Sequence, residues 1–511
     1  MTAPFRLDHA RFQAALATTP GHYPAFIGGK AVEADGVRVI ERASPAHGTL
    51  VSRYADVGAA GLDAALTAAR RAFDEGPWPR AAAAERSRVL HRAADLIEGK
   101  AELIATLDTL ESGKPIAQAR AEIAGAVDIW RYAAGLARDL HGESTTAMGE
   151  RKLGVVLRDP VGVVSIITPW NFPFLIVSQK LPFALAAGCT AVVKPSEMTS
   201  ASTLLLGPLL AEAGLPEGVC NILAGTGATV GAPMTSDPRV DMVTFTGSTR
   251  VGKSTMRTAA DTLKKVSMEL GGKNAQLIFP DCDMDAAIDA AVFGAFFNAG
   301  ECCNAGSRLL VHRDCVKPFL AGFVERARGV SVGDPLDEAT KVGSLISPAH
   351  LALVQGHLTA ARDAGATLAH GGSVLDVGAG SFMEPTVLAG VSPAMAVARE
   401  EVFGPVVTVT AFDTPDEAVA IANGIDYGLS ASVWSRDFDT AVSVSRRVRA
   451  GTVWVNTFMD GAAELPFGGY RQSGLGRELG RGAVADFTEE KTLHLHTGPR
   501  TSWWAPRPSV S

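Results

Sequence analysis

The chain has 511 residues, of which 47% are hydrophobic and 20% are charged, and its formal net charge is −7. This length exceeds one ordinary hydrophobic core, so two or three domains are expected, and the composition excludes global disorder. The mild negative charge, without a dense lysine and arginine cluster, argues against nucleic-acid binding.

No stretch approaches about 18 uninterrupted apolar residues, so we expect no membrane span. Residues 1–20 contain charged side chains and no continuous apolar core, so we expect no secretory signal. The six cysteines form no disulfide framework, and their spacing matches no zinc ligand set. The sequence therefore predicts a cytoplasmic protein with reduced thiols and no metal site.

The front of the chain predicts helices at residues 61–73 and 85–110, where apolar side chains recur at helical spacing and Gly99 predicts a break. Beyond residue 142, short apolar runs alternate with helix-like segments such as residues 201–213. These runs predict strands at residues 153–157, 161–167, 190–193 and 219–223. Strands that alternate with helices predict a parallel sheet with crossover helices.

A second series of strands is predicted after a double glycine, Gly271 and Gly272. Its members are residues 275–278, 308–311, 406–410, 431–434 and 452–455. The double glycine is the expected hinge between two α/β domains, and ligand clefts usually form between domains.

Residues 297–308 (FNAGECCNAGSR) are the most informative segment, because they place two adjacent cysteines among small residues after an apolar run. About thirty residues upstream, residues 266–274 (VSMELGGKN) carry one carboxylate before the double glycine. A thiol and a carboxylate in glycine-rich turns are typical of covalent catalysis with a carboxylate base. A buried cysteine by itself is more often part of core packing than a nucleophile.

Further motifs follow a fixed order along the chain. They are residues 168–173 (TPWNFP), 192–197 (VVKPSE), 245–249 (FTGST), 401–405 (EVFGP) and 466–469 (PFGG). Together with the two segments above, this set resembles the NAD(P)-dependent aldehyde dehydrogenase superfamily from about residue 27 to about residue 493. The resemblance implies an α/β fold with a Rossmann-type cofactor domain, an α/β catalytic domain and a small β arm that pairs subunits.

The resemblance also implies domain boundaries and a homodimer or homotetramer. The cofactor domain would take residues 1–143 and 160–271, the catalytic domain residues 272–485, and the arm residues 144–159 and 486–500. Residues 501–511, which are aromatic and rich in proline, are expected to be a flexible tail that packs on a neighbouring subunit.

By the same resemblance, Cys303 is the nucleophile, Glu269 the base and Asn171 the donor to the oxyanion, while Cys302 is a packing neighbour. Thiolate attack on an aldehyde gives a thiohemiacetal, loss of hydride to nicotinamide gives a thioester, and water releases the acid. An amide N–H stabilises an oxyanion without titrating, and burial raises the pKa of a carboxylate toward the working pH of a general base.

No G-x-G-x-x-G motif follows the expected strand, so the ordinary dinucleotide fingerprint is missing. The resemblance supplies the cofactor contacts instead: Thr168, Pro169, Trp170, Lys194, Ser196, Glu197, Gly227, Phe245, Gly247, Ser248, Leu270, Gly271, Glu401 and Phe403. Ser248 would begin a helix that faces the pyrophosphate. Glu197 would accept hydrogen bonds from ribose hydroxyls and repel a 2′-phosphate, which predicts NAD over NADP.

The substrate pocket implied by the resemblance is lined by Phe172, Gln179, Phe297, Phe458, Met459 and Phe467. Gln179 stands where many members have tryptophan, which favours a polar or hydroxylated aldehyde and leaves betaine aldehyde or an aminoaldehyde as the alternative. Glu301 replaces the usual glutamine, and its carboxylate is expected to raise the pKa of the nearby thiol or to shift which group handles protons.

Other functions stay open at this point. A thiol and a carboxylate also suit a thioesterase or acyltransferase without a redox step, and acyl-CoA formation is a third outcome. Lys194, Glu197 and Glu401 argue for a nicotinamide cofactor, and Glu269 argues for water as the acyl acceptor. A catalytically silent protein on this fold has no need of Cys303, Glu269 and Asn171 together.

Overall fold

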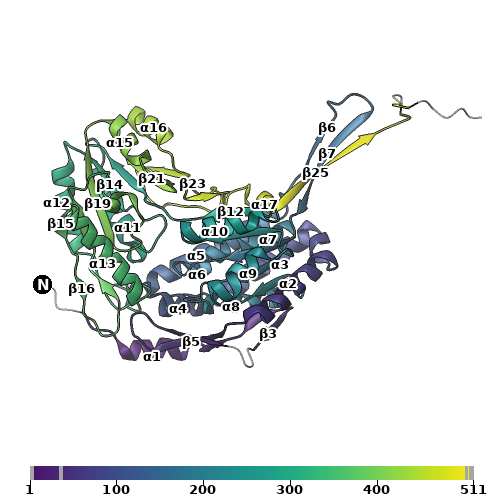
Figure 1. The fold of residues 1–511 in the computed structure, drawn as a ribbon, viewed down its shortest axis with the longest axis horizontal. Helices are drawn as coiled ribbons and strands as arrows, with labels where there is room; N and C mark the ends of the chain where they lie inside the picture. Colours follow the sequence, from purple (N-terminus) through teal and green to yellow (C-terminus); the bar gives the residue numbers. More distant parts are fainter. Residues whose placement is uncertain (1–4, 34–37, 501–503, 506–511) are drawn as a thin grey trace, which may run out of the picture.

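The computed structural model describes residues 5–33, 38–500 and 504–505. Two α/β lobes lie side by side, and a long β arm projects from the first lobe (Figure 1). The predicted tail lies outside the described residues except for Trp504 and Ala505.

The first lobe is built on an eight-stranded sheet of order β24-β12-β11-β8-β9-β10-β2-β3. Five central strands are parallel: β8 (Val163–Ile167), β9 (Thr190–Lys194), β10 (Cys220–Ile222), β11 (Met242–Thr246) and β12 (Lys265–Glu269). The edge strands β2 (Ala25–Ile27), β3 (Lys30–Val32) and β24 (Gly474–Leu475) are antiparallel. The central strands are apolar runs because helices cover both faces of the sheet.

The chain reverses its direction of travel across this sheet between β8 and β11. From β8 it moves outward through β9 and β10, and it then returns to place β11 and β12 on the other side of β8. Open parallel sheets bind ligands beyond the carboxyl ends of their strands at such a switch point. The topology therefore locates a site beyond Ile167 and Thr246.

Helices surround the first sheet, and glycines end several of them. The helices are α2 (Gly58–Asp74), α3 (Ala83–Glu98), α4 (Ala101–Ser112), α5 (Ile116–Leu136), α6 (Pro173–Ser178), α7 (Leu181–Ala187), α8 (Ala201–Ala213), α9 (Ala232–Ser236) and α10 (Thr249–Ala260). Gly99 caps α3, as the predicted break requires, and Gly113, Gly188 and Gly214 end α4, α7 and α8 in the left-handed conformation.

The second lobe has a seven-stranded sheet of order β15-β18-β19-β14-β13-β21-β22. Its strands are β13 (Ala275–Ile278), β14 (Arg308–His312), β15 (Thr367–His370), β18 (Thr386–Ala389), β19 (Val406–Phe412), β21 (Ser430–Trp434) and β22 (Thr452–Val455). Its helices are α11 (Met284–Phe296), α12 (Val316–Arg328), α13 (Pro348–Asp363), α14 (Ala396–Arg399), α15 (Pro415–Asn423) and α16 (Phe438–Arg447). Apart from β15, the strands pair in parallel.

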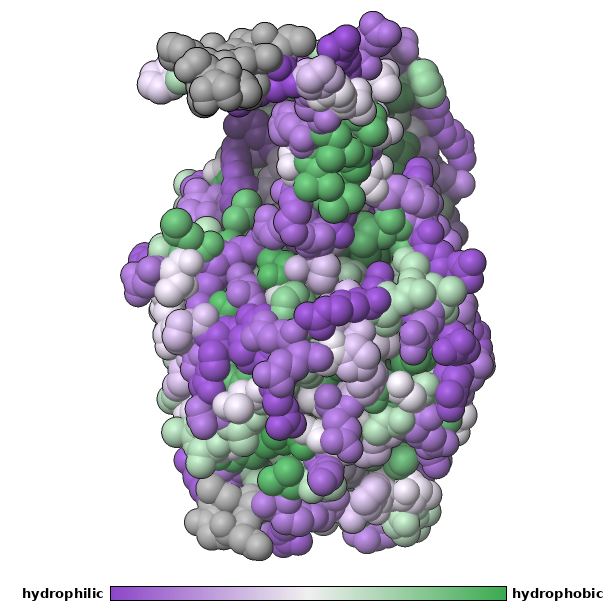
Figure 2. Space-filling model, turned by 90° about the vertical axis from the view of Figure 1, so that its right-hand side faces the viewer, coloured by the Kyte–Doolittle hydropathy of each residue, from purple (hydrophilic) through white to green (hydrophobic). Residues whose placement is uncertain are grey.

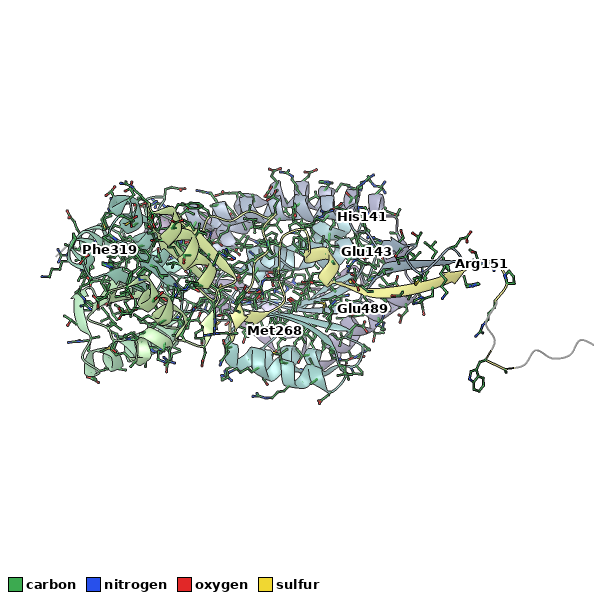
Figure 3. All side chains as sticks on the ribbon, turned by 90° about the horizontal axis from the view of Figure 1, so that it is seen from above. His141, Glu143, Arg151, Met268, Phe319 and Glu489 are labelled. Atoms are coloured by element: carbon green, nitrogen blue, oxygen red, sulfur yellow. The ribbon has the colours of Figure 1, made fainter. Side chains whose placement is uncertain are left out.

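The arm consists of β6 (Glu143–Thr145), β7 (Lys152–Pro160) and β25 (Thr488–His496), which form one antiparallel sheet. Helix α17 (Ala483–Asp486) leads into β25. Figure 2 views the molecule from the side on which the arm projects. Hydrophobic surface gathers in the upper part of this view. In Figure 3, Arg151 lies far out on the arm, Glu143 and Glu489 lie nearer the body, and Phe319 lies in the opposite lobe.

Small elements complete the fold. Helix α1 (His9–Ala17) packs Phe12 against Val51, Leu110 and Leu336, and so contacts both lobes. The remaining strands are β1 (His22–Tyr23), β4 (Val39–Ala43), β5 (Leu50–Ala55), β16 (Val374–Leu375), β17 (Phe382–Met383), β20 (Tyr427–Gly428) and β23 (Tyr470–Arg471).

Every strand and helix predicted from the sequence is present. The five strands before residue 56 were not predicted, because they are short, with two to six residues each. The predicted boundaries of the domains stay a prediction, although β24, from the range assigned to the catalytic domain, joins the first sheet. None of the helices in the described part of the chain has the length and apolar character needed to cross a membrane.

Candidate active site

The predicted nucleophile lies in an irregular loop between α11 and β14. Asn298, Ala299 and Gly300 all have positive φ, of 51°, 55° and 71°. The chain therefore turns sharply before Cys302, which is buried, and Cys303, which is partly exposed. Left-handed conformations of non-glycine residues store strain and persist only where the surroundings hold them.

Three amide side chains hold this loop. Asn171 Nδ2 donates to the carbonyl oxygen of Glu301 over 3.0 Å, and Asn298 Nδ2 donates to the same oxygen over 3.0 Å. Asn298 N donates to Oε1 of Gln118, in α5, over 3.2 Å. An amide group has two N–H bonds, so Asn171 keeps one for a second acceptor.

The double glycine allows the loop to pack against the end of the first sheet. A Cβ on Gly272 would lie 2.4 Å from the carbonyl oxygen of Cys303, and a Cβ on Gly271 would lie 2.4 Å from Oε2 of Glu401. Asn274 Nδ2 donates to the carbonyl oxygens of Cys303 (2.7 Å) and Ala305 (2.9 Å). The glycines thus permit close approach of the protein's own groups.

Glu269 is the last residue of β12 and is 3% exposed. Neither of its carboxylate oxygens has a hydrogen-bond partner within the protein. Burial, and then the nearby charge of Glu478, raise the pKa of Glu269 well above its ordinary value. A buried carboxylate without internal partners is available to a water molecule or a substrate.

Glu269 and Cys303 line the same cavity, which has a volume of about 660 Å³. Phe172, Gln179, Phe297, Met459 and Phe467 also line it, as the sequence predicts. Phe458 does not. It is buried in the core of the second lobe and packs edge-on against Trp454, whose side chain lines the cavity in its place. The Phe458 ring packs against Gly294 and Gly306, where the lack of side chains leaves room for it.

The groups around Cys303 favour its neutral thiol. Its hydrogen bond with Cys302, burial, and the charges of Glu401 and Glu269 raise the pKa of Cys303 well above its ordinary value. Glu301 is not among the main groups that raise this pKa. The Glu301 carboxylate accepts from the backbone N–H of Ile346 over 3.0 Å instead.

The predicted cofactor residues gather along one edge of the first sheet. Thr168, Lys194, Gly247 and Leu270 end or follow β8, β9, β11 and β12, four adjacent parallel strands. Ser248 is the exposed N-cap of α10, and its Oγ accepts from Val251 N. This arrangement suits a dinucleotide, because a helix N-terminus and strand ends meet at the topological switch point.

Lys194 and Glu197 lie together beyond β9. Lys194 Nζ donates to the carbonyl oxygen of Pro195 over 2.8 Å and lies 3.5 Å from Oε2 of Glu197. Burial lowers the pKa of Lys194, while the Glu197 side chain stays 38% exposed. An exposed carboxylate beside this lysine is placed to accept from ribose hydroxyls.

Glu401 and Phe403 reach the same edge from the second lobe. Glu401 Oε1 accepts from Gly272 N over 2.9 Å, and burial raises the pKa of Glu401 to about 7. Phe403 has φ 56° and meets Trp170 edge-on, with ring centroids 5.4 Å apart. The segments at residues 168–171 and 401–403 are thus in contact.

The other predicted cofactor residues occupy less direct positions. Gly227 begins a turn of π-helix (Gly227–Gly231), Ser196 lies in the loop after β9, and Pro169 precedes Trp170. Phe245 is buried, and its ring lies against Gly247.

Several residues that build the site were not predicted. They are Gln118, Lys180, Asn274, Asn298, His350 and Glu478. Asn274 and Asn298 lie inside the two segments singled out from the sequence, where an amide in a glycine-rich turn was the available signal. The others come from distant helices and loops, and no local pattern marks them.

Comparison with known proteins gives consistent results. Residues 31–493 match the model of the aldehyde dehydrogenase family. Aldehyde dehydrogenase family 2 member C4 of Arabidopsis thaliana is 40% identical over 478 residues, which cover 93% of this chain and 95% of that protein.

Two solved structures are similar over nearly their whole length. The NAD-dependent aldehyde dehydrogenase of Sinorhizobium meliloti has a TM-score of 0.95 and 48% identity, covering 96% of this chain and 98% of that one. The betaine aldehyde dehydrogenase of Staphylococcus aureus in complex with NAD+ has a TM-score of 0.95 and 36% identity, covering 97% and 100%.

Proposed function

This chain belongs to the aldehyde dehydrogenase family and is an NAD-dependent aldehyde dehydrogenase, and from that premise we propose how its residues oxidise an aldehyde to the carboxylic acid. The observation that supports the proposal is that Cys303 and the unpartnered carboxylate of Glu269 line one cavity. The predicted family and fold class are confirmed.

Cys303 Sγ attacks the carbonyl carbon of the aldehyde after its thiol proton passes to Glu269 or solvent. The free N–H of Asn171 and the backbone N–H of Cys303 stabilise the oxyanion of the resulting thiohemiacetal. NAD, when bound, supplies the hydride acceptor. Lys194 and Glu197 would hold its adenosine ribose, the α10 N-terminus its pyrophosphate, and Glu401 its nicotinamide ribose.

Glu269 acts in the second half of the reaction. The thioester on Cys303 is hydrolysed by a water molecule whose proton Glu269 accepts, and the thiolate leaves with the acid released. The unpartnered carboxylate oxygens are free to orient that water. Because water accepts the acyl group in this scheme, the main product is the carboxylic acid and not an acyl thioester of another thiol.

A Glu269→Gln enzyme tests this assignment. It should release about one NADH per active site in a burst and then stall, because the isosteric amide cannot accept the water proton. A Cys303→Ala enzyme should show no burst. Unchanged steady turnover in Glu269→Gln would remove Glu269 as the base, and a burst in Cys303→Ala would remove the thiol as the nucleophile.

The charge of the cavity indicates the substrate class. Five carboxylates line it, namely Glu122, Asp128, Glu269, Asp460 and Glu478, and its described lining contains no lysine or arginine. Lys114 forms an ion pair with Glu122, and Lys180 forms one with Glu478; both lysines are buried and lie outside the cavity lining. Asp128 and Asp460 are exposed, so their charges face a substrate directly.

This charge favours an aldehyde that carries an amine or quaternary ammonium group over the hydroxylated aldehyde that Gln179 suggests. Phe172, Phe297, Trp454 and Phe467 add aromatic faces, which attract cations. The similarity to a betaine aldehyde dehydrogenase is in line with this class.

An Asp128→Asn enzyme measures the contribution of one carboxylate. The KM for a cationic aminoaldehyde should rise about three- to fivefold, as expected for an exposed ion pair. The KM for a neutral aldehyde of equal length should not change, and an Asp139→Asn enzyme, altered outside the cavity, serves as the control. An equal effect on both aldehydes would contradict the cationic class.

We also propose a cytoplasmic homodimer or homotetramer with the domain boundaries given above. The six cysteines are all free thiols, which suits a reducing compartment. The arm projects from the body with apolar side chains exposed, which suits contact with a second subunit.

A further inference from the structure

Glu301, which precedes the two cysteines, is 3% exposed and contacts residues of its own loop and of two distant segments of the chain. Its carbonyl oxygen accepts from Asn171 and Asn298, and its Oε1 accepts from the backbone N–H of Ile346. The mechanism proposed above uses none of these contacts. Burying a carboxylate costs free energy unless its partners compensate for the loss of water.

His350, in the first turn of α13, is the second unexplained group. Its Nε2 lies 2.6 Å from the carbonyl oxygen of Phe403 and 3.7 Å from Oε1 of Glu301. Because a carbonyl oxygen can only accept, Nε2 carries the proton and donates it to Phe403. The imidazole also meets the rings of Trp170 and Phe403 edge-on, at centroid distances of 5.5 and 6.0 Å.

Phe403 needs such a contact because its backbone is left-handed, at φ 56°. A bulky residue in this conformation is strained and must be held by its surroundings. The hydrogen bond from His350 holds the carbonyl of that residue. It therefore fixes the turn that carries Glu401, two residues earlier in the chain.

We propose that Glu301 and His350 are positioning residues that tie the cysteine loop to the turn at residues 401–403 and so set the nicotinamide half of the cofactor site. The inference rests on the proposed function, because the turn has this role only where NAD binds. Glu301 anchors the cysteine loop to Ile346 through a hydrogen bond, and its carboxylate faces the imidazole of His350. His350, four residues after Ile346, in turn donates to the carbonyl oxygen of Phe403 and so holds the turn at residues 401–403.

A carboxylate suits this junction better than the glutamine usual in the family. When ionised, both of its oxygens accept, so whichever way the group is turned the N–H of Ile346 meets an acceptor. The N–H of His350, which donates to Phe403, then has no competing donor beside it. A glutamine would present an acceptor to one of them and a competing donor to the other.

The first test compares His350→Leu with His350→Gln in the full-length enzyme. Leucine fills space but cannot donate, whereas the glutamine Nε2 can donate to the Phe403 carbonyl. NAD binding is followed by quenching of tryptophan fluorescence, without aldehyde, and kcat and KM are measured separately. We expect leucine to raise the Kd and KM for NAD about three- to tenfold, the effect of one lost hydrogen bond, with kcat much less changed, and glutamine to restore both.

An unchanged Kd for NAD in His350→Leu would overturn the proposal. Equal weakening by leucine and glutamine would also overturn it, because a merely structural role does not depend on a donor. Absence of NAD binding by the natural enzyme would instead contradict the proposed function, so the two failures are distinguishable.

The second test addresses Glu301 through Glu301→Gln and Glu301→Met. The amide keeps an acceptor for Ile346 N, and methionine has none of comparable strength. Alkylation of Cys303 by iodoacetamide, followed by mass spectrometry without cofactor, reports the loop itself. We expect methionine to change the alkylation rate and raise the Kd for NAD together, and glutamine to change both less. A changed alkylation rate with unaltered NAD binding would overturn the coupling.

Discussion

At the scale of single residues, the proposed chemistry depends on a carboxylate whose pKa is raised by its own surroundings. Glu269 must lose its proton to accept one from water, yet burial and the charge of Glu478 raise its pKa. Lys180, which is buried, forms an ion pair with Glu478 and donates to Thr244 Oγ1 over 3.1 Å. Its positive charge acts on Glu269 in the opposite direction.

The opposing effects of Glu478 and Lys180 on the pKa of Glu269 predict how the rate of hydrolysis depends on pH. Because only deprotonated Glu269 serves as the base, the rate falls as the pH falls through its raised pKa. Replacing Glu478 with glutamine removes the charge repulsion between Glu478 and Glu269 and leaves the positive charge of Lys180 unpaired. The pKa of Glu269 should therefore fall, and the acidic side of the pH–rate profile should move to lower pH. Lys180→Met should move that side of the profile to higher pH.

The measurement is the rate of acyl-enzyme hydrolysis in single-turnover experiments from pH 5 to pH 9. Opposite shifts for the two variants support the electrostatic account. Shifts in the same direction, or none, contradict it.

At the scale of elements, the arm shows how strand register builds a surface. The pairing of β25 with β7 sets Leu493 opposite Val155 and Leu495 opposite Leu153. Residues directly opposite each other in an antiparallel pair point to the same side, so these four share one face. Leu493 and Leu495 are 38% and 46% exposed, which is unusual for leucine in a strand without a partner surface.

Negative charges introduced on that face should weaken the proposed contact between subunits. A Leu493→Glu, Leu495→Glu enzyme should show a smaller molar mass than the natural enzyme in light scattering, because burying two carboxylates opposes contact. Thr492→Glu, on the other face of the same strand, is the matched control and should leave the mass unchanged. An unchanged mass in the double variant would exclude this face as the contact between subunits.

At the scale of the whole molecule, the site exists only where the two lobes meet. Asn171 and Glu269 come from the edge of the first sheet, whereas Cys303 and Glu401 come from loops that precede β14 and β19 of the second. The double glycine at residues 271–272 is where the chain crosses, and its lack of side chains lets both loops approach. The hydrogen bond from Asn171 to Glu301 spans 130 residues of sequence.

The sequence by itself determined the α/β class and most of the longer elements, and its motifs predicted Cys303, Glu269 and Asn171 as the chemical groups. Those features are local, because periodicity, glycine breaks and short motifs are written in neighbouring residues. The short strands before residue 56 escaped prediction because tertiary pairing, and no local pattern, makes them strands.

Only the tertiary structure decided how these groups act together. It turned Phe458 into the core, directed Glu301 toward Ile346 and His350, and set Glu478 beside Glu269. It also collected Asp128 and Asp460 at one cavity. Burial and the distance between charges depend on how distant segments pack, and these quantities set the pKa values and the charge of the cavity, which no motif records.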